Sequence, residues 1–456
     1  MSRLLISAAH KSSGKTTVTL GLCAAIAARG TRVQPFKKGP DYIDPMWLSL
    51  AAGRDCHNLD FYCMSREEIL ASVGQNSQGA DLALIEGNKG LYDGLDLDGS
   101  NSNAALAKLT HAPVILVLDA RGMTRGIAPL ILGYQAFDTD VKIAGVILNQ
   151  LGGSRHEAKL RAVIEHYTDV PVLGGVHRDP ELVIDERHLG LIPSNEATAT
   201  NDIIDAIRSR IDDQVDIDRL LSLAGTDTLD YTPRPPAPGP AGERVRIGIA
   251  RDSAFGFYYP DDLAALQRAG AELVPFNTLE DSALPDIDGL FIGGGFPETC
   301  MTGLAANSAL RTDIRTAIEN GLPAYAECGG LMYLTRSLSW RGQSCEMVGV
   351  IPADTLMHEK PQGRGYVRLR ETAAAPWPGE PPANGVIPAH EFHYSALANI
   401  DQPLEFAYEV ERGTGVDGRH DGILLHKLLA CYSHLRDTDL HHWAARFVEY
   451  VRNNRR

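Results

Sequence analysis

Residues 7–17 (SAAHKSSGKTT) have the types and order of a phosphate-binding loop. Backbone N–H groups in such a turn point at phosphate oxygens, and the start of the following helix adds positive potential. Lys15 can reach the terminal phosphates of a nucleotide, and the Thr16 hydroxyl is a candidate ligand for Mg²⁺. The usual pattern GxxxxGK[ST] begins with Gly, where this chain has Ala9. The predicted nucleotide-binding residues of the loop are Ser13, Gly14, Lys15, Thr16 and Thr17.

Three further loops carry charged or polar residues and follow predicted strands. They are residues 37–45 (KKGPDYIDP), 86–93 (EGNKGLYD) and 149–153 (NQLGG). In an open parallel sheet such loops gather at the carboxyl ends of the strands, where ligands bind. We expect Asp41 and Glu86 to be oxygen ligands of Mg²⁺ and Lys37 to neutralise phosphate charge. Asn149 fits a purine contact and a plain turn equally well.

A second kind of chemistry is indicated by residues 323–332 (PAYAECGGLM). Cys328 lies between an apolar strand and a helical pattern, and two glycines follow it, which is typical of an exposed nucleophile on a tight turn. In residues 293–298 (GGGFPE), Gly294 and Gly295 can offer backbone N–H groups as an oxyanion hole. His434 is the candidate base, with His426 and the pair His441 and His442 as alternatives. Together these residues predict acyl transfer through a thioester.

The elements that must position these residues alternate between short apolar runs and helical patterns. Before residue 230, residues 4–7, 32–36, 81–85, 113–118 and 142–148 are predicted strands, and residues 15–29, 102–110 and 154–167 are predicted helices. After a run with five prolines, residues 245–250, 272–276, 289–292 and 323–326 are predicted strands again. We therefore predict an α/β protein of two doubly wound domains, residues 1–230 and 244–456, joined by a Pro-rich linker at 231–243. Residues 375–382 are expected to form a surface loop.

Composition excludes several classes of protein. The chain of 456 residues has a net charge of −15, which argues against a general nucleic-acid binder. No stretch is long and apolar enough for a membrane helix, and the N-terminus does not read as a signal peptide. Seven scattered cysteines without a CxxC pair predict neither a disulfide framework nor a zinc site. We expect a cytoplasmic enzyme.

The chain resembles the cobyrinic acid a,c-diamide synthase family along nearly its whole length. In the first half the resemblance rests on VQPFKKGPDYIDP (33–45), NLD (58–60) and GLYDG (90–94), and it implies a P-loop domain of the dethiobiotin-synthetase type. In the second half it rests on GGGFPE, AECGGLMYL and HEFHYS (390–395), and it implies a flavodoxin-like domain of a class I glutamine amidotransferase.

The resemblance implies a reaction at two sites. Cys328 would release ammonia from glutamine with His434 as the proton carrier, and ATP with Mg²⁺ would phosphorylate a carboxylate of a tetrapyrrole. Class I amidotransferases usually carry a Glu two residues beyond the histidine; this chain has Arg436 there, so a pair with a less strongly oriented base is expected. Asp44, Tyr92 and Asp93 are assigned to the acceptor site by similarity. Related ligases suggest a homodimer.

Two lysines depart from the commonest family members. Lys38 and Lys89 stand where small or apolar residues are usual, so we expect them near the acceptor, unless they are merely solvated. The patterns AHKSSGKTT and EGNKGLYDG resemble the sirohaem amidase branch. The resemblance therefore implies an acceptor that is cobyrinic acid or a sirohydrochlorin-derived macrocycle. A P-loop nucleotide switch or partitioning ATPase, with an amidotransferase-like scaffold that has no activity, is the alternative.

Overall fold

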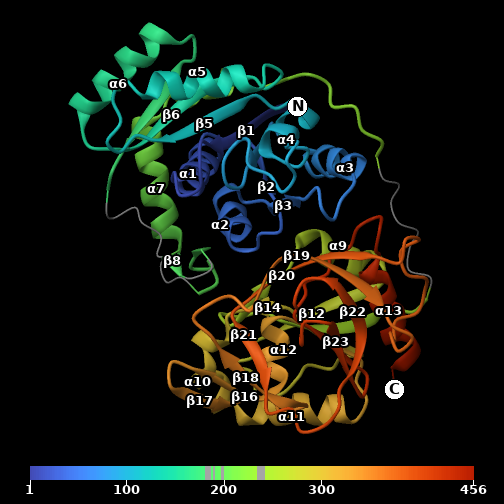
Figure 1. Ribbon diagram of the computed structural model, residues 1–456. Coiled ribbons are helices and arrows are strands. Elements are labelled where there is room, and N and C mark those ends of the chain that lie inside the picture. Colours follow the sequence, from blue (N-terminus) through green and yellow to red (C-terminus); the bar gives the residue numbers. More distant parts are fainter. Residues whose placement is uncertain (180–185, 188–189, 197–199, 234–241, 456) are drawn as a thin grey trace. The chain divides into compact units, whose positions relative to one another are not determined.

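The computed structural model describes residues 1–179, 186–187, 190–196, 200–233 and 242–455 (Figure 1). The chain divides into two compact units, Met1–Arg234 and Pro235–Arg456, which are described separately. Of the predicted linker at 231–243, residues 234–241 lie outside the described residues.

The N-terminal unit is built on a seven-stranded sheet in the order β3-β2-β4-β1-β5-β6-β7. All neighbouring strands are parallel, as near-continuous apolar runs predict. Each of the five strands predicted for this half is present. The bounds are β1 (Ser2–Ala8), β2 (Val33–Lys38), β3 (His57–Leu59), β4 (Leu82–Glu86), β5 (Val114–Asp119), β6 (Ile143–Leu151) and β7 (Val172–His177).

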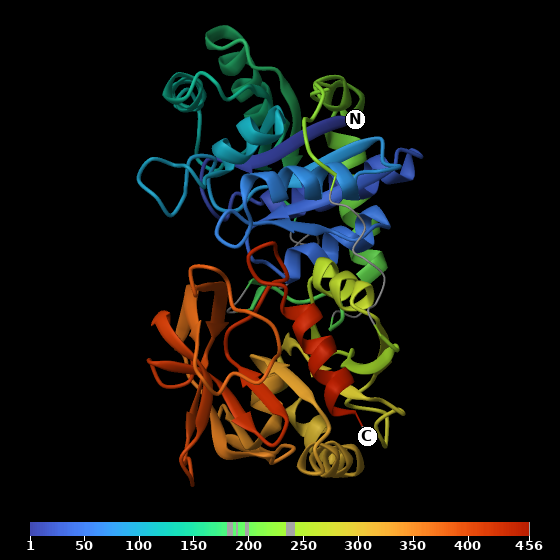
Figure 2. The ribbon, with the colours of Figure 1, turned by 90° about the vertical axis from the view of Figure 1, so that its right-hand side faces the viewer.

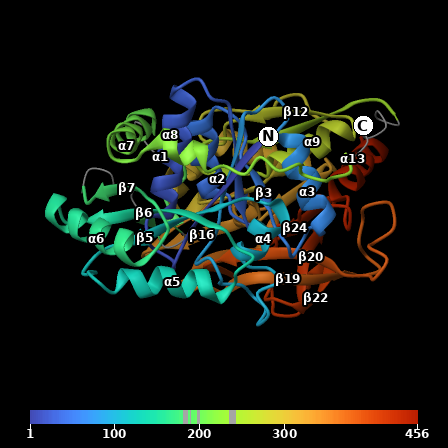
Figure 3. The same ribbon diagram turned by 90° about the horizontal axis from the view of Figure 1, so that it is seen from above.

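Helices cover both faces of this sheet (Figure 3). On one face α1 (Lys15–Ala28) packs against α2 (Ile43–Ala52) and α7 (Thr200–Gln214). On the other, α5 (Ile127–Phe137) packs against α6 (Ser154–Tyr167), and α3 (Arg66–Asn76) against α4 (Asn103–Thr110). The unit also contains α8 (Ile217–Ser222) and the short strands β8 (Glu186–Arg187) and β9 (Gly190–Leu191). The loops after β1, β2 and β4 therefore meet at one edge of the sheet, as predicted.

The C-terminal unit has a nine-stranded sheet in the order β12-β10-β13-β15-β24-β23-β22-β19-β20. Its first five strands are parallel and include the four that the sequence predicts: β10 (Val245–Ala250), β12 (Ala271–Phe276), β13 (Gly289–Ile292), β15 (Ala324–Glu327) and β24 (Leu428–Cys431). The rest is antiparallel and was not predicted: β19 (Gly363–Glu371), β20 (Ile387–His393), β22 (Glu405–Arg412) and β23 (His420–Leu425). Residues 372–386, which include the predicted loop at 375–382, form neither helix nor strand.

Smaller elements complete this unit. A four-stranded sheet contains β16 (Thr335–Trp340), β17 (Gln343–Glu346), β18 (Ile351–Met357) and β21 (Ser395–Ala398), and β11 (Phe255–Phe257) pairs with β14 (Gly294–Gly295). The helices are α9 (Pro260–Arg268), α10 (Met301–Ala306), α11 (Ser308–Glu319), α12 (Gly329–Leu334) and α13 (Trp443–Asn454). Helices α9 and α13 lie side by side (Figure 2). No helix within the described part of the chain could span a membrane.

Candidate active sites

The loop between β1 and α1 has the backbone of a phosphate cradle. Gly14 precedes α1 with φ of 76°, a left-handed conformation that favours glycine. A Cβ at Gly14 would lie 2.0 Å from Nδ2 of Asn149, so this position cannot carry a side chain without movement. Asn149 itself donates from Nδ2 to the carbonyl of Ser13 at 2.8 Å. Asn149 lies within β6 and not in the plain turn that the sequence allowed, and its side chain supports the loop through Ser13; the purine contact stays a prediction.

Behind this loop, one lysine lies among three carboxylates. Lys37 is buried on β2, and its Nζ donates to Asp44 and, at 2.9 Å, to Oε1 of Glu86, with Asp41 at 3.9 Å. Burial alone would lower the pKa of Lys37, but the charges of Asp44 and Glu86 raise it above its usual range. The Thr16 hydroxyl donates to Glu86 at 2.7 Å and to Asp44 at 3.2 Å.

Asp41 and Asp44 occupy different positions in this cluster. Oδ1 of Asp41 accepts hydrogen bonds from the backbone N–H groups of Ile43 and Asp44, so it caps the start of α2. Burial and the neighbouring carboxylate of Asp44 raise the pKa of Asp41 to about 7. Burial would also raise the pKa of Asp44, but Lys37 lowers it below its usual range. Asp44, assigned from the sequence to the acceptor side, is thus the carboxylate that the structure places beside Thr16 and Glu86.

The atoms of this cluster that could bind a metal are the oxygens of Thr16, Asp41, Asp44 and Glu86. Oxygen ligands suit Mg²⁺ better than a softer metal. Oε2 of Glu86 is buried and has no hydrogen-bond partner among the described residues, which leaves a lone pair for a ligand. Nowhere in the described ranges do three His, Cys, Asp or Glu side chains form a metal site by themselves.

The residues assigned to the acceptor differ in exposure. Lys38 is buried, its Nζ donates to Asn88 at 3.2 Å, and burial lowers its pKa to about 8. Lys89 is exposed, with φ of 44°. Asp93 is also exposed and accepts from the Gly90 N–H at 2.9 Å, whereas the Tyr92 hydroxyl donates to the carbonyl of Tyr134. Lys89 and Asp93 are therefore open to a ligand, whereas Lys38 is buried and donates to Asn88.

Two asparagines that the sequence did not single out as site residues hold these loops. Asn103 is fully buried at the start of α4 and donates from Nδ2 to the carbonyls of Asn88 and Gly90. Asn58 donates to the carbonyls of Gly39 and Asp41. Asn58 lies in the NLD segment (58–60), so the family motif could have pointed to its role. Asn103 lies in no such motif, so the sequence held no sign of its role.

In the C-terminal unit, Cys328 occupies a strained turn between β15 and α12. Its φ of 47° and ψ of −101° are rare for a residue with a side chain. The two following glycines lie close to neighbouring backbone. A Cβ at Gly330 would lie 2.2 Å from the Ile292 carbonyl oxygen, which requires glycine there, and a Cβ at Gly329 would make a tight contact of 3.0 Å with the backbone of Gly295. The turn has the backbone geometry predicted for a nucleophile elbow, but Cys328 is buried, with 7% of the residue exposed, where the sequence indicated an exposed nucleophile.

The GGGFPE loop lies against this elbow. Gly294 and Gly295 form β14, and the backbone N of Gly295 faces Gly329. A Cβ at Gly294 would lie 2.7 Å from Cε1 of His434. The three predicted parts of this site, Cys328, the oxyanion loop and His434, are thus brought together.

His434 is the candidate base that reaches the thiol. Burial alone would lower the pKa of His434, but hydrogen bonding to Cys328 and Glu327 raises it to about 10. Its ring stacks on that of His390, with centroids 4.8 Å apart and planes at 14°. The alternative bases lie elsewhere: His441 contacts Arg446, His442 pairs with Asp437, and His426 lies in the turn after β23.

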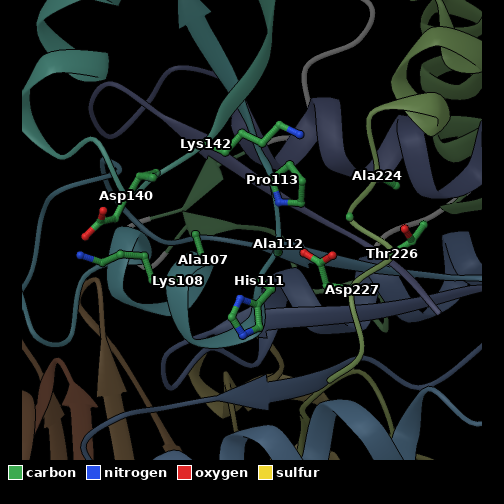
Figure 4. A pocket seen from close by; sticks show the side chains of 12 residues that line it. Ala107, Lys108, His111, Ala112, Pro113, Asp140, Lys142, Ala224, Thr226 and Asp227 are labelled. Atoms are coloured by element: carbon green, nitrogen blue, oxygen red, sulfur yellow. The ribbon is translucent and has the colours of Figure 1, made fainter. Parts of the chain in front are cut away.

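A separate cavity of about 520 Å³ opens in the N-terminal unit, beside the starts of β5 and β6 (Figure 4). Lys108, His111 and Lys142 line it together with Asp140 and Asp227. The cavity therefore lies at the amino ends of the strands, whereas the nucleotide loop lies at their carboxyl ends, where ligands of parallel sheets usually bind.

Comparison with known proteins finds a matching family for each unit. The family described as "CobQ/CobB/MinD/ParA nucleotide binding domain" matches residues 5–192, and "CobB/CobQ-like glutamine amidotransferase domain" matches residues 246–438. The chain is 50% identical to a cobyrinate a,c-diamide synthase of Magnetococcus marinus, over 99% of this chain and 97% of the relative. It is 42% identical to one of Methanosarcina acetivorans, over 98% and 95%, and 41% identical to one of Archaeoglobus fulgidus, over 98% and 97%.

A nucleotide-binding unit fused to a glutamine amidotransferase unit defines a ligase that forms carbon–nitrogen bonds with nitrogen from glutamine. The chain belongs to the cobyrinate a,c-diamide synthase family, which confirms the resemblance seen in the sequence and the predicted fold class.

Proposed function

We propose that this chain amidates peripheral acetate carboxylates of a cobyrinate-type tetrapyrrole, with ATP and glutamine as co-substrates. The observation that carries the proposal is the juxtaposition of Cys328, on its strained turn, with His434 and the oxyanion loop, on the same chain as the GKT loop. The names of the relatives support the acceptor class. A nucleotide switch with an inactive scaffold would have no use for the elbow and its base.

In the amidotransferase unit, the proposed step begins from an ion pair in which the proton of the Cys328 thiol already resides on His434, so that a thiolate stands beside an imidazolium. The sulfur of Cys328 attacks the amide carbon of glutamine, a C–S bond forms, and the carbonyl oxygen gains charge that backbone N–H groups at Gly294 and Gly295 stabilise. His434 then gives its proton to the amide nitrogen, the C–N bond breaks and ammonia leaves. Water attacks the thioester, which releases glutamate and restores the thiol.

In the nucleotide-binding unit, the backbone of residues 13–17 holds the phosphates of ATP, with Lys15 and Lys37 compensating their charge. Mg²⁺, held by Thr16, Glu86 and Asp44 or Asp41, would neutralise phosphate charge as the γ-phosphoryl group moves. A carboxylate oxygen of the acceptor takes that group while its bond to the β-phosphate oxygen breaks and ADP leaves. The acyl phosphate is then reactive because phosphate is a good leaving group. Ammonia attacks the acyl carbon, phosphate departs, and a proton is lost. Lys89, Tyr92 and Asp93 contribute to the acceptor side.

The test is mass spectrometry of products from parallel incubations with cobyrinic acid, sirohydrochlorin and sirohaem, each with ATP, Mg²⁺ and glutamine. We expect diamide from cobyrinic acid and no product when ATP is omitted. Faster amidation of sirohydrochlorin or sirohaem than of cobyrinic acid would assign the chain to the sirohaem amidase branch. Product without ATP consumption would contradict the acyl-phosphate mechanism. Light scattering on the same preparation tests the proposed homodimer.

A further inference from the structure

A histidine that carries a proton between two atoms works best when its second ring nitrogen is held by an acceptor. Two residues beyond His434, this chain has Arg436. The Arg436 guanidinium is buried, pairs with Asp261 at 3.4 Å, and lies over the ring of Tyr259 at 4.8 Å. Position 436 therefore supplies a positive charge that is bound to other groups and cannot accept a hydrogen bond from the imidazole.

A carboxylate reaches the ring from another element. Oε2 of Glu327 lies 3.4 Å from Nδ1 of His434, and both side chains are about 4% exposed. Oε1 of the same carboxylate accepts from the Leu435 N–H at 3.0 Å and from the Tyr325 hydroxyl at 2.6 Å. One oxygen is thus fixed by structural hydrogen bonds while the other faces the imidazole.

We propose that Glu327 is the positioning residue of the glutaminase site: it orients His434 and stabilises its imidazolium form, in place of an acid at position 436. This inference rests on the proposed role of Cys328 and His434. It replaces the expectation of a weakly oriented base.

The strained turn explains how neighbours in sequence can serve one imidazole. Successive side chains of a strand point to opposite faces, so Glu327 and Cys328 would diverge if β15 continued. The left-handed φ of Cys328 breaks the alternation at that residue. Because of this turn, nucleophile and carboxylate both reach His434.

Other charged groups around the ring do not compete for this role. His390 stacks on His434, and burial, His434 and Arg436 lower its pKa well below the usual range, so it is neutral. Asp421 accepts from the backbone N–H groups of Tyr432 and Ser433, and Asp262 on α9 accepts from that of Asp437. Among the described residues, the charged and titratable groups that contact residues 432–437 include Glu327 from β15, Cys328 from the turn after it, His390 and His393 from β20, Asp261 and Asp262 from α9, and Asp421 from β23.

The decisive substitution is Glu327→Gln, which keeps an oxygen acceptor for Leu435 and Tyr325 but removes the charge. We expect kcat of glutamine hydrolysis to fall by roughly tenfold to hundredfold with KM for glutamine little changed. The alkaline limb of kcat/KM should move to lower pH, because the imidazolium loses its counter-charge. Wild type and variant are measured in the same buffers, so ionisation of the glutamine substrate affects both pH profiles equally and does not contribute to the difference between them. Amidation driven by ammonium chloride should be unchanged.

Asp421→Asn is the matched control, since Asp421 supports the same segment through backbone amides without contact to the imidazole. It should leave the alkaline limb in place even if it lowers stability. The inference is overturned if Glu327→Gln hydrolyses glutamine like the wild type, or if its pH profile matches that of Asp421→Asn. If Cys328→Ala still hydrolyses glutamine, the proposed function fails first, and the two failures are thereby distinguished.

Discussion

In the amidotransferase unit a strained turn presents the thiol of Cys328 to its base, whereas in the nucleotide-binding unit Lys37 and the carboxylates around it neutralise one another. The first site has its reacting groups in place before glutamine arrives. In the second, Lys37 already donates to Asp44 and Glu86, so one of its three N–H donors remains for a phosphate when a nucleotide binds. The difference indicates that the strained backbone of Cys328 positions the groups of the first site, whereas attraction between Lys37 and its carboxylates positions those of the second.

The largest effect should come from the strained turn. We expect Cys328→Ala to lower glutamine-driven amidation by at least about 10³-fold, because no other group can form the thioester. Amidation driven by ammonium chloride should persist, since the nucleotide-binding unit is untouched. Product formation with each nitrogen source is the measurement, and Cys345→Ala on β17 is the control for loss of a cysteine. Unchanged use of glutamine by Cys328→Ala would refute the assignment.

Lys15 and Lys37 both lie near Glu86, and substituting them should have different effects: one on activity, the other on stability. Lys15, 3.8 Å from Glu86, should be dispensable for folding, so Lys15→Ala is expected to abolish amidation with either nitrogen source without lowering the unfolding temperature. Lys37→Met removes the nearest positive charge from the buried carboxylate of Glu86 and the half-buried carboxylate of Asp44, and this should cost about 3–5 kcal/mol of unfolding free energy.

Denaturant unfolding and amidation assays with ammonium chloride test both variants. ATP-independent product from Lys15→Ala would contradict phosphate activation. A Lys37→Met protein as stable as the wild type would show that the carboxylates do not depend on this lysine.

The pH dependence of stability should report the charge on His434. Its pKa is raised from 6.5 to about 10 in the folded state, so the imidazolium stabilises the fold fully below pH 6.5, and this contribution is lost as the pH rises towards 10. The difference in unfolding free energy between wild type and His434→Gln should therefore shrink by up to about 1.4 kcal/mol per pH unit between pH 7 and 10. A difference that is constant across this range would show that His434 is neutral when folded.

The sequence predicted the parts of both sites that depend on short motifs. The GKT loop follows β1, and Cys328, Gly294 and His434 meet, because strand-to-helix junctions of a parallel sheet can be located from apolar runs and glycines. The contacts of Glu327 were missed, since a residue beside the nucleophile should point away from it in a regular strand. The antiparallel strands β19 to β23 were also missed, because half-exposed strands give a weaker pattern than buried parallel ones.

The smallest effect is expected in the loop after β4, at Lys89, which is exposed, whereas the neighbouring Lys38 is buried. Lys89→Glu should raise KM for the tetrapyrrole by a few-fold and leave KM for ATP unchanged, because a screened charge at the surface contributes about 1 kcal/mol or less. Lys159→Glu on α6, also exposed, makes the same charge change away from the loop and should alter neither KM. Lys38→Glu would instead place a buried carboxylate beside Asn88 and should lower stability. Steady-state kinetics with each substrate varied in turn, together with thermal unfolding, separate these outcomes. Equal increases in both KM values for Lys89→Glu would point to a general defect of the nucleotide-binding unit and would remove Lys89 from the acceptor site.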